Sequence, residues 1–312
     1  MEPRRARLLK WVAFVVFVVL LFVVNHYRRE GSFMNADLLA KMESPYNTIF
    51  VYQTKDGRRH MAFGYRRHRY FEAVHQPGRP LDLDLPYTRL LTVGIAYAPQ
   101  LNNILSIGMG GGGTSTYLLG TLPQARITEV ELDPDVVVLA RKYFEYADSP
   151  RRALFVEDGR KFLMTTHETY DLVLLDAYRG AFVPFHLLTG EFYAELKRHL
   201  VPGGVVVENI STEALLADST LATLEHAFQQ VECFRVGDNL VAVAYDGPRK
   251  PDDELLQHAQ QLDTQYHLPY SMVAMLRGRT EAPAKPGVRP LTDDFAPVDT
   301  LNAIERHNER PN

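Results

Sequence analysis

The chain of 312 residues can hold one large domain or two smaller ones, since domains usually contain about 100–200 residues. Its 46% hydrophobic and 11% aromatic content is typical of a globular protein and excludes a disordered or collagen-like chain. The formal charge of -4 argues against a dedicated nucleic-acid binder, and a single cysteine excludes an internal disulfide framework or a cysteine-based zinc site.

An apolar run at residues 11–24 follows a basic segment at the start of the chain. As a helix it covers roughly 21 Å of the ~30 Å hydrocarbon core, and Leu8 and Leu9 extend it if Lys10 reaches the headgroups. A cleaved signal peptide has similar features, but bulky and charged residues follow the run, so we expect residues 1–30 to be an uncleaved anchor. The basic residues before the run favour an external domain, whereas the reaction predicted below uses a cytosolic compound, so the orientation stays open.

A small antiparallel β unit is expected next. After a polar stretch that ends at Ser44, residues 46–54 alternate as a strand, Asp56-Gly57 is a hairpin signal, and residues 60–65 can form the return strand. Residues 87–97 have a helical pattern.

From Asn103 onward, apolar strands alternate with helices. The expected strands are 104–107, 126–132, 153–156, 171–175 and 204–208, followed by 232–236 and 240–245. The expected helices are 115–122, 134–146, 160–165, 189–200 and 215–230. This alternation indicates an α/β fold with a parallel sheet covered on both faces. With the last two strands as an antiparallel hairpin, it predicts a methyltransferase-like Rossmann fold with a mostly parallel seven-stranded sheet.

Beyond residue 247 the chain is rich in proline and charge, with helical patterns at 252–266 and 270–276. Four parts are therefore expected. They are an N-terminal transmembrane anchor (1–30), a small β-rich domain plus a helix (31–97), a Rossmann-like nucleoside-binding domain (98–246), and a helical, proline-rich tail (247–312).

A glycine-rich turn, GMGGGGTS, joins the first expected strand of the parallel sheet to the next helix. Gly108, Gly110 and Gly112 allow the backbone to approach a ligand closely, and the helix N-terminus presents unpaired N–H groups. Glu131 ends the next strand, where a carboxylate can accept both ribose hydroxyls of a nucleoside. The simpler alternatives are a flexible turn for the glycines and a solvated carboxylate for Glu131. The occurrence of the glycine turn and the acid together favours a nucleoside site.

Two more carboxylates follow strands of this sheet. Asp158-Gly159 comes after the third strand, where an acid can accept from the exocyclic amine of adenine. Asp176 ends the fourth strand, where it can attract an ammonium group and take its proton when the amine attacks an alkyl carbon. Because open α/β sheets bind ligands at the carboxyl ends of their strands, we expect these acids in one cleft. Asp171 starts the fourth strand at the opposite edge and is expected to be structural, and His186 and His199 have no partners that suggest a metal site.

From residue 46 to 245 the chain resembles the spermidine synthase (polyamine aminopropyltransferase) family, especially its divergent, membrane-associated bacterial branch. The resemblance rests on ILSIGMGGGG, EVELDPDVVVLARKYF, VEDGRKFL, YDLVLLDAY and LVPGGVVVEN together. It implies transfer of an aminopropyl group from decarboxylated S-adenosylmethionine to a polyamine acceptor, with release of methylthioadenosine. It also implies that Glu131 binds ribose, that Asp158 binds adenine and that Asp176 accepts the proton. A homodimer and a bacterial inner-membrane location are further implications.

Three positions depart from the family pattern. Gly111 stands where the glycine loop usually has an aspartate for the amino group of the cofactor, and Arg179 stands where the strand-four motif has a second acid. The usual Y-H-E segment appears as Tyr87-Thr88-Arg89. Two unit charges about 4 Å apart interact by roughly 4 kcal/mol at an effective dielectric constant near 20. Arg179 should therefore weaken diamine binding, unless it points to solvent or holds a carboxylate.

On the acceptor side we expect Tyr87 and Tyr178, and the tail motif LTDDFAP offers Asp293 and Asp294 as acids that close over the pocket. The simpler alternative for the tail is a surface turn ended by proline. Two other functions stay open. One is a methyltransferase that uses S-adenosylmethionine, which the missing loop acid favours. The other is a membrane-tethered nucleoside-binding protein without catalysis.

Overall fold

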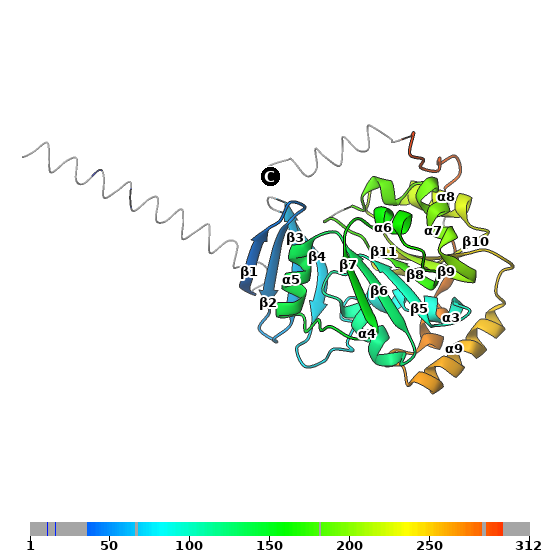
Figure 1. Ribbon diagram of the computed structural model, residues 1–312, viewed down its shortest axis with the longest axis horizontal. Helices are drawn as coiled ribbons and strands as arrows, with labels where there is room; N and C mark the ends of the chain where they lie inside the picture. The colour runs from blue at the N-terminus through cyan, green and yellow to red at the C-terminus, as the bar shows by residue number, and fades with distance from the viewer. Residues whose placement is uncertain are drawn as a thin grey trace, which may run out of the picture.

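The computed structural model describes residues 36–65, 68–180, 182–282 and 285–295, together with Trp11 and Val16. Two β-sheets organise this part of the chain, and helices surround the larger one (Figure 1). Apart from Trp11 and Val16, the predicted anchor at residues 1–30 lies outside the described residues. Within the described ranges, none of the helices has both the length and the apolar character needed to cross a bilayer.

The smaller sheet is antiparallel, with the strand order β1-β2-β3-β4. Its strands are β1 (Asp37–Glu43), β2 (Thr48–Gln53), β3 (Arg59–Tyr65) and β4 (His68–His75). The predicted β2–β3 hairpin is present, but the sheet begins earlier than expected. β1 lies in the polar stretch that ends at Ser44, where no strand is predicted. It forms a strand there because Ala40 and Met42 alternate with exposed residues and pack on the neighbouring hydrophobic cluster.

The larger sheet has the strand order β12-β10-β11-β9-β8-β5-β6-β7. Five strands are mutually parallel: β5 (Asn103–Ile107), β6 (Arg126–Glu131), β7 (Arg152–Val156), β8 (Tyr170–Leu175) and β9 (Leu200–Ser211). The predicted antiparallel hairpin consists of β10 (Gln230–Val236) and β11 (Asn239–Tyr245). The prediction of seven strands is wrong, because β12 (Arg279–Glu281) pairs with β10 as an eighth. Three residues are too few for a recognisable alternation.

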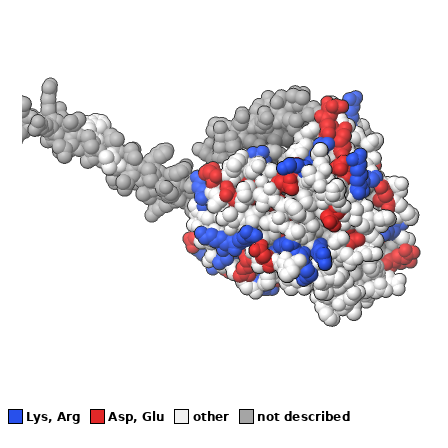
Figure 2. Space-filling model, viewed as in Figure 1, with Lys and Arg blue, Asp and Glu red and all other residues white. Residues whose placement is uncertain are grey.

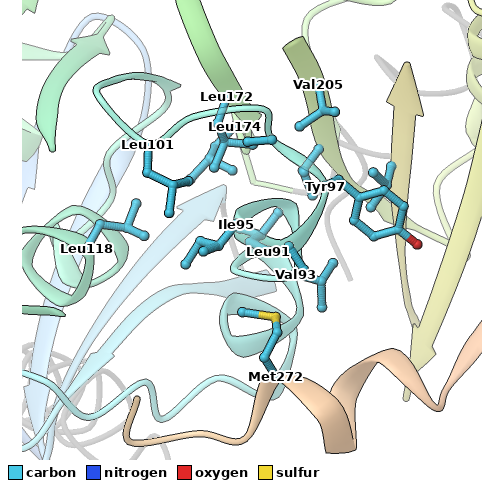
Figure 3. Close-up of a cluster of buried hydrophobic side chains, with 14 of the residues drawn as sticks. Leu91, Val93, Ile95, Tyr97, Leu101, Leu118, Leu172, Leu174, Val205 and Met272 are labelled. Atoms are coloured by element: carbon cyan, nitrogen blue, oxygen red, sulfur yellow. The ribbon is translucent and has the colours of Figure 1, made fainter. Parts of the chain in front are cut away.

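Helices cover both faces of the larger sheet, as predicted. One face carries α2 (Pro86–Leu91), α3 (Gly94–Tyr97), α4 (Gly113–Thr121), α9 (Asp252–Tyr266) and α10 (Met272–Leu276). The other face carries α6 (Gly159–Thr165), α7 (Gly190–Arg198) and α8 (Ala217–Ala227). Within β8, Leu172 and Leu174 pack in the first core, drawn in Figure 3, and Val173 and Leu175 pack in the second. This alternation explains why residues 172–175 are all apolar.

The helix expected at residues 87–97 is divided into α2 and α3. A Cβ atom on Gly94 would lie 2.6 Å from side-chain atoms of both Leu172 and Val207. The chain turns at Thr92 and Val93, and the second short helix begins at Gly94, which lies directly on the sheet. Figure 3 shows Leu91, Val93, Ile95 and Tyr97 of this segment beside the strands.

The helix α5 (Pro134–Tyr143) follows β6 of the larger sheet and packs against the smaller sheet. Figure 1 shows it beside the four-stranded sheet. Its apolar residues pack with β2 and β3 in a separate hydrophobic cluster that includes Ile49, Met61, Val136 and Leu139. This packing holds β4 against the glycine loop that follows β5, since a Cβ on Gly111 would contact Ala73. A cleft therefore forms between β4 and the carboxyl ends of the parallel strands.

Candidate active site

A cleft with about 1150 Å³ of empty space, partly open to solvent, lies at the carboxyl ends of β5, β6, β7 and β8. Most of the site residues predicted from the sequence line it: Gly108, Gly110, Glu131, Asp158, Gly159, Asp176, Tyr87 and Tyr178. Parallel strands bring their carboxyl ends to one edge of a sheet, so acids distant in the sequence meet there.

The cleft is much more acidic than the face of the molecule shown in Figure 2. On the face shown in Figure 2, basic and acidic side chains are interspersed. The cleft lining instead includes many carboxylates: Glu72, Asp82, Asp84, Glu131, Asp133, Glu157, Asp158 and Asp176. Among the described lining residues, the basic side chains are His75 and Arg179. Such a lining favours cationic ligands.

The glycine loop follows β5 directly, and two of its predicted ligand-binding glycines face the cleft. Gly108 and Gly110 have positive φ angles of 90° and 51°, which side chains of L-residues rarely adopt. Gly112 does not line the cleft, contrary to its expected role. A Cβ atom on Gly112 would lie 2.2 Å from the Tyr146 ring, so a glycine is needed for the loop to pass Tyr146 where α4 begins.

Glu131 is the last residue of β6, and its two carboxylate oxygens accept from backbone N–H groups of the glycine loop and of the turn after β6. The Met109 N–H donates to Oε2 at 3.1 Å, and the Asp133 N–H donates to Oε1 at 3.0 Å. Burial raises the pKa of Glu131, and these backbone hydrogen bonds oppose the shift. Because a carboxylate has about four acceptor positions, Glu131 can still receive two hydroxyl groups.

Asp158 follows β7 and caps α6, accepting from the Lys161 N–H at 2.9 Å. His186 Nε2 lies 2.7 Å from its other carboxylate oxygen, Oδ2. This hydrogen bond is the main reason why the pKa of Asp158 is lowered. Sequence reasoning treated His186 as an ordinary residue, since the two positions are 28 residues apart and only the fold brings them together.

Asp176 comes directly after β8 and has two side-chain donors. Asn209 Nδ2 donates to its Oδ1 at 2.9 Å, and the Tyr87 hydroxyl donates as well. Asn209 is held in turn by Asn239, whose Nδ2 donates to Asn209 Oδ1 at 2.9 Å. Burial raises the pKa of Asp176 to about 6, and the two donors partly offset that rise. A carboxylate with this pKa is ionised near neutral pH and can accept a proton.

Tyr178 lies beside Asp176 and is fixed by the end of β9. Its hydroxyl accepts from the Ser211 N–H at 2.5 Å and donates to the Asn209 carbonyl at 3.2 Å. Burial raises the pKa values of both Tyr178 and Tyr87, so both phenols stay protonated at neutral pH. Two rigid aromatic side chains therefore flank the carboxylate.

Arg179 adopts neither of the two orientations expected from the sequence. Its Nε donates to the Tyr46 carbonyl at 2.9 Å, and its guanidinium lies 5.8 Å from the centre of the Tyr46 ring. The side chain is thus directed toward the turn between β1 and β2.

The acids of the tail motif lie elsewhere. The Asp293 carboxylate accepts two hydrogen bonds from Arg160, at 2.8 and 2.6 Å, and one from the Thr189 hydroxyl at 2.8 Å. Neither Asp293 nor Asp294 lines the cleft, and a bridge between Thr292 and Phe295 closes a short turn. The surface-turn alternative describes this segment better. Asp171 accepts from the N–H groups of Asn102 and Asn103 at the opposite edge of the sheet, consistent with a structural role.

Sequence reasoning missed Glu72 and Asn209, which both belong to the cleft or its immediate support. No motif surrounds Glu72, and the available signal was a carboxylate in a β-rich segment. Asn209 lies near the end of β9, just after the predicted strand at 204–208 and at the same sheet edge as Asp176. This position could have identified it.

Comparisons with known proteins agree with this geometry. Residues 85–242 match the family model described as "Spermine/spermidine synthase domain". The chain is 29% identical over 202 residues to a polyamine aminopropyltransferase of Vibrio vulnificus, and the match covers 64% of this chain and 68% of that protein.

Two solved structures are similar in fold. A probable spermidine synthase from Corynebacterium glutamicum has a TM-score of 0.63 at 20% identity, over 83% of this chain and 97% of the other. Human methyltransferase-like protein 13, solved in complex with SAH, has a TM-score of 0.53 at 23% identity, over 69% of this chain and 99% of the other. These likenesses confirm the predicted methyltransferase-like α/β fold.

Proposed function

The chain belongs to the spermine/spermidine synthase domain family, and we propose that it is an aminopropyltransferase. It transfers the aminopropyl group of decarboxylated S-adenosylmethionine to a polyamine acceptor and releases methylthioadenosine. The observation that carries this proposal is that Glu131, Asp158 and Asp176, at the ends of three strands, line the same cleft. The Rossmann-like unit supplies these acids, and the small β unit closes the other side of the cleft.

We propose that the nucleoside lies along the ends of β6 and β7. Glu131 accepts the ribose hydroxyls with the lone pairs that Met109 and Asp133 leave free. Asp158 accepts from the exocyclic amine of adenine, while His186 and the α6 N-terminus hold its carboxylate in place. Gly108, Gly110 and Gly159 leave room for close approach of the ligand, since each lines the cleft without a side chain.

Asp176 is the proposed general base. The lone pair of the acceptor nitrogen attacks the propyl carbon bonded to sulfur, and the C–S bond breaks. Its electron pair stays on the sulfonium sulfur, which becomes the neutral thioether of methylthioadenosine. The nitrogen passes its extra proton to the Asp176 carboxylate, which Asn209 and Tyr87 keep oriented. Tyr87 and Tyr178 enclose the acceptor chain, and Arg179 is held toward Tyr46.

The test is a product assay. The purified full chain is incubated with decarboxylated or intact S-adenosylmethionine and with putrescine or spermidine, and products are identified by mass spectrometry. Methylthioadenosine and an aminopropylated amine from the decarboxylated compound are expected. A methylated acceptor formed from S-adenosylmethionine would replace this proposal with the methyltransferase alternative. Lack of binding to both compounds and to methylthioadenosine would contradict both enzymatic functions.

Residues 1–30 are proposed to anchor the enzyme in a membrane, on the strength of their apolar run and flanking basic residues. The full chain should sediment with membranes and resist extraction by high salt and alkaline carbonate. A variant lacking residues 1–30 should stay in the supernatant and keep its affinity for methylthioadenosine. A full chain found in the supernatant after cell lysis would contradict the anchor. Homodimerisation stays a prediction, which the mass of the shortened variant in solution would test.

A further inference from the structure

Glu72, on β4 of the small sheet, brings a carboxylate into the cleft from the side opposite the strand-end acids. The Gly180 N–H donates to it, but its Oε1 is inaccessible to water and has no hydrogen-bond partner among the described residues. Burial raises its pKa well above the ordinary value, and the nearby charges of Asp176 and Glu131 raise it further. An unpartnered carboxylate oxygen in a ligand cleft is costly unless a ligand donates to it.

The position of Glu72 also explains why the glycine loop has no acid at Gly111. A Cβ atom on Gly111 would lie 2.9 Å from Ala73 Cβ and 2.9 Å from Phe144 Cδ1. β4 therefore occupies the space that a side chain on the loop would need. Ala73 is the residue that follows Glu72, so the strand that excludes the loop side chain also carries a carboxylate to the same part of the cleft.

The acids of the cleft differ in their cationic partners. Asp82 pairs with Arg79 at 2.6 Å, and Glu157 pairs with Lys161 at 3.4 Å. In the part of the chain that the structure describes, no such ion pair is found for Glu72 or Asp176. Arg179, three residues after Asp176, is turned toward Tyr46. Within the described residues these two carboxylates have no cationic partner, so a cationic ligand can pair with them.

We propose that Glu72 binds the primary ammonium of decarboxylated S-adenosylmethionine and thereby selects it over S-adenosylmethionine. This assignment rests on the proposed function. Glu72 takes the place of the missing loop acid beside the nucleoside-binding loop, where a Cβ on Gly110 would lie 3.2 Å from the Glu72 carbonyl. The amino-acid end of S-adenosylmethionine carries a carboxylate as well as an ammonium. The ionised Asp176, and Glu72 once its proton has left, repel that carboxylate.

Binding of the ammonium should be linked to proton release. Free Glu72 has a raised pKa and keeps its proton to higher pH than an ordinary glutamate. A bound ammonium favours the ionised carboxylate, so the proton leaves when the ligand binds. The affinity for decarboxylated S-adenosylmethionine should therefore rise with pH until free Glu72 is itself ionised. Methylthioadenosine lacks the amine, so its affinity should not follow this dependence.

The experiment compares the dissociation constants of methylthioadenosine, decarboxylated S-adenosylmethionine and S-adenosylmethionine by calorimetry. Glu72→Gln should weaken binding of the decarboxylated compound by about 10- to 100-fold, the usual effect of losing a hydrogen bond to a charged group. Methylthioadenosine should bind as before, and the preference over S-adenosylmethionine should largely disappear. Glu72→Asp, which keeps the charge, should recover part of that preference. Glu43→Gln, at an exposed glutamate of β1, is the control and should change none of the three constants.

An unchanged ratio between decarboxylated S-adenosylmethionine and methylthioadenosine in Glu72→Gln would overturn the assignment. A higher KM for the amine acceptor with unchanged cofactor binding would also overturn it, since Glu72 would then serve the other substrate. If Glu72→Gln does not fold, the same ratio is measured in the unmodified chain across pH, and a pH-independent ratio rejects the assignment. If the unmodified chain does not bind methylthioadenosine at all, the proposed function itself fails.

Discussion

Replacing Asp176 with asparagine is expected to lower kcat by about 100- to 10,000-fold, the usual contribution of a positioned general base. Asparagine has nearly the same shape and its amide oxygen can still accept from Asn209, so methylthioadenosine should bind as before. The rate of methylthioadenosine formation at saturating substrate measures the effect. Asp148→Asn is the control, because the Asp148 side chain is 84% exposed and pairs with Arg141 outside the cleft. Full turnover by the Asp176 variant would exclude its role as base.

The pH profile provides an independent test of the same role. Because the pKa of Asp176 is raised to about 6, the carboxylate is ionised above that pH and can accept a proton. Below it the carboxyl group is protonated, so kcat at saturating substrate, where the bound ammonium keeps Glu72 ionised, should fall about tenfold per pH unit. The residual activity of Asp176→Asn should lack this acid limb. An acid limb that persists unchanged in the variant would assign the titration to another group.

Replacing Gly108 with alanine is expected to destabilise the fold by about 3 kcal/mol or more. Gly108 has a φ of 90°, and a Cβ there would lie 2.2 Å from the Asp176 carbonyl oxygen. The clash would separate the loop after β5 from the loop after β8, which carries the proposed base. Urea denaturation monitored by circular dichroism gives the loss in the free energy of unfolding, and calorimetry gives the loss of methylthioadenosine affinity.

Gly113→Ala is the matched control in the same loop. Its added Cβ would have no neighbour within 4 Å, and its backbone lies outside the positive-φ region at the start of α4. Alanine there should leave the free energy of unfolding unchanged or raise it by about 0.5–1 kcal/mol. Equal stability of the Gly108 and Gly113 variants would show that the contact with Asp176 is not tight.

Local sequence pattern was sufficient to predict the parallel sheet and the carboxylates at the ends of its strands. Apolar strands alternating with helices place Glu131, Asp158 and Asp176 at equivalent strand ends, and the geometry of a parallel sheet then brings them to one edge. The errors arose where local pattern is weak. β12 is too short to alternate, and the expected helix is interrupted at Thr92 and Val93, just before Gly94 comes into contact with the sheet.

By itself, the amino-acid sequence determined the fold class and the positions of Glu131, Asp158 and Asp176 at strand ends, because both follow from short-range periodicity and from the ends of consecutive strands. Only the tertiary structure decided the other side of the cleft. Glu72 comes from a different sheet, Arg179 is held by Tyr46, and Asp293 is held by Arg160. These orientations depend on how the small sheet and the tail pack on the parallel sheet. Contacts between segments that lie more than a hundred residues apart leave no local signal in the chain.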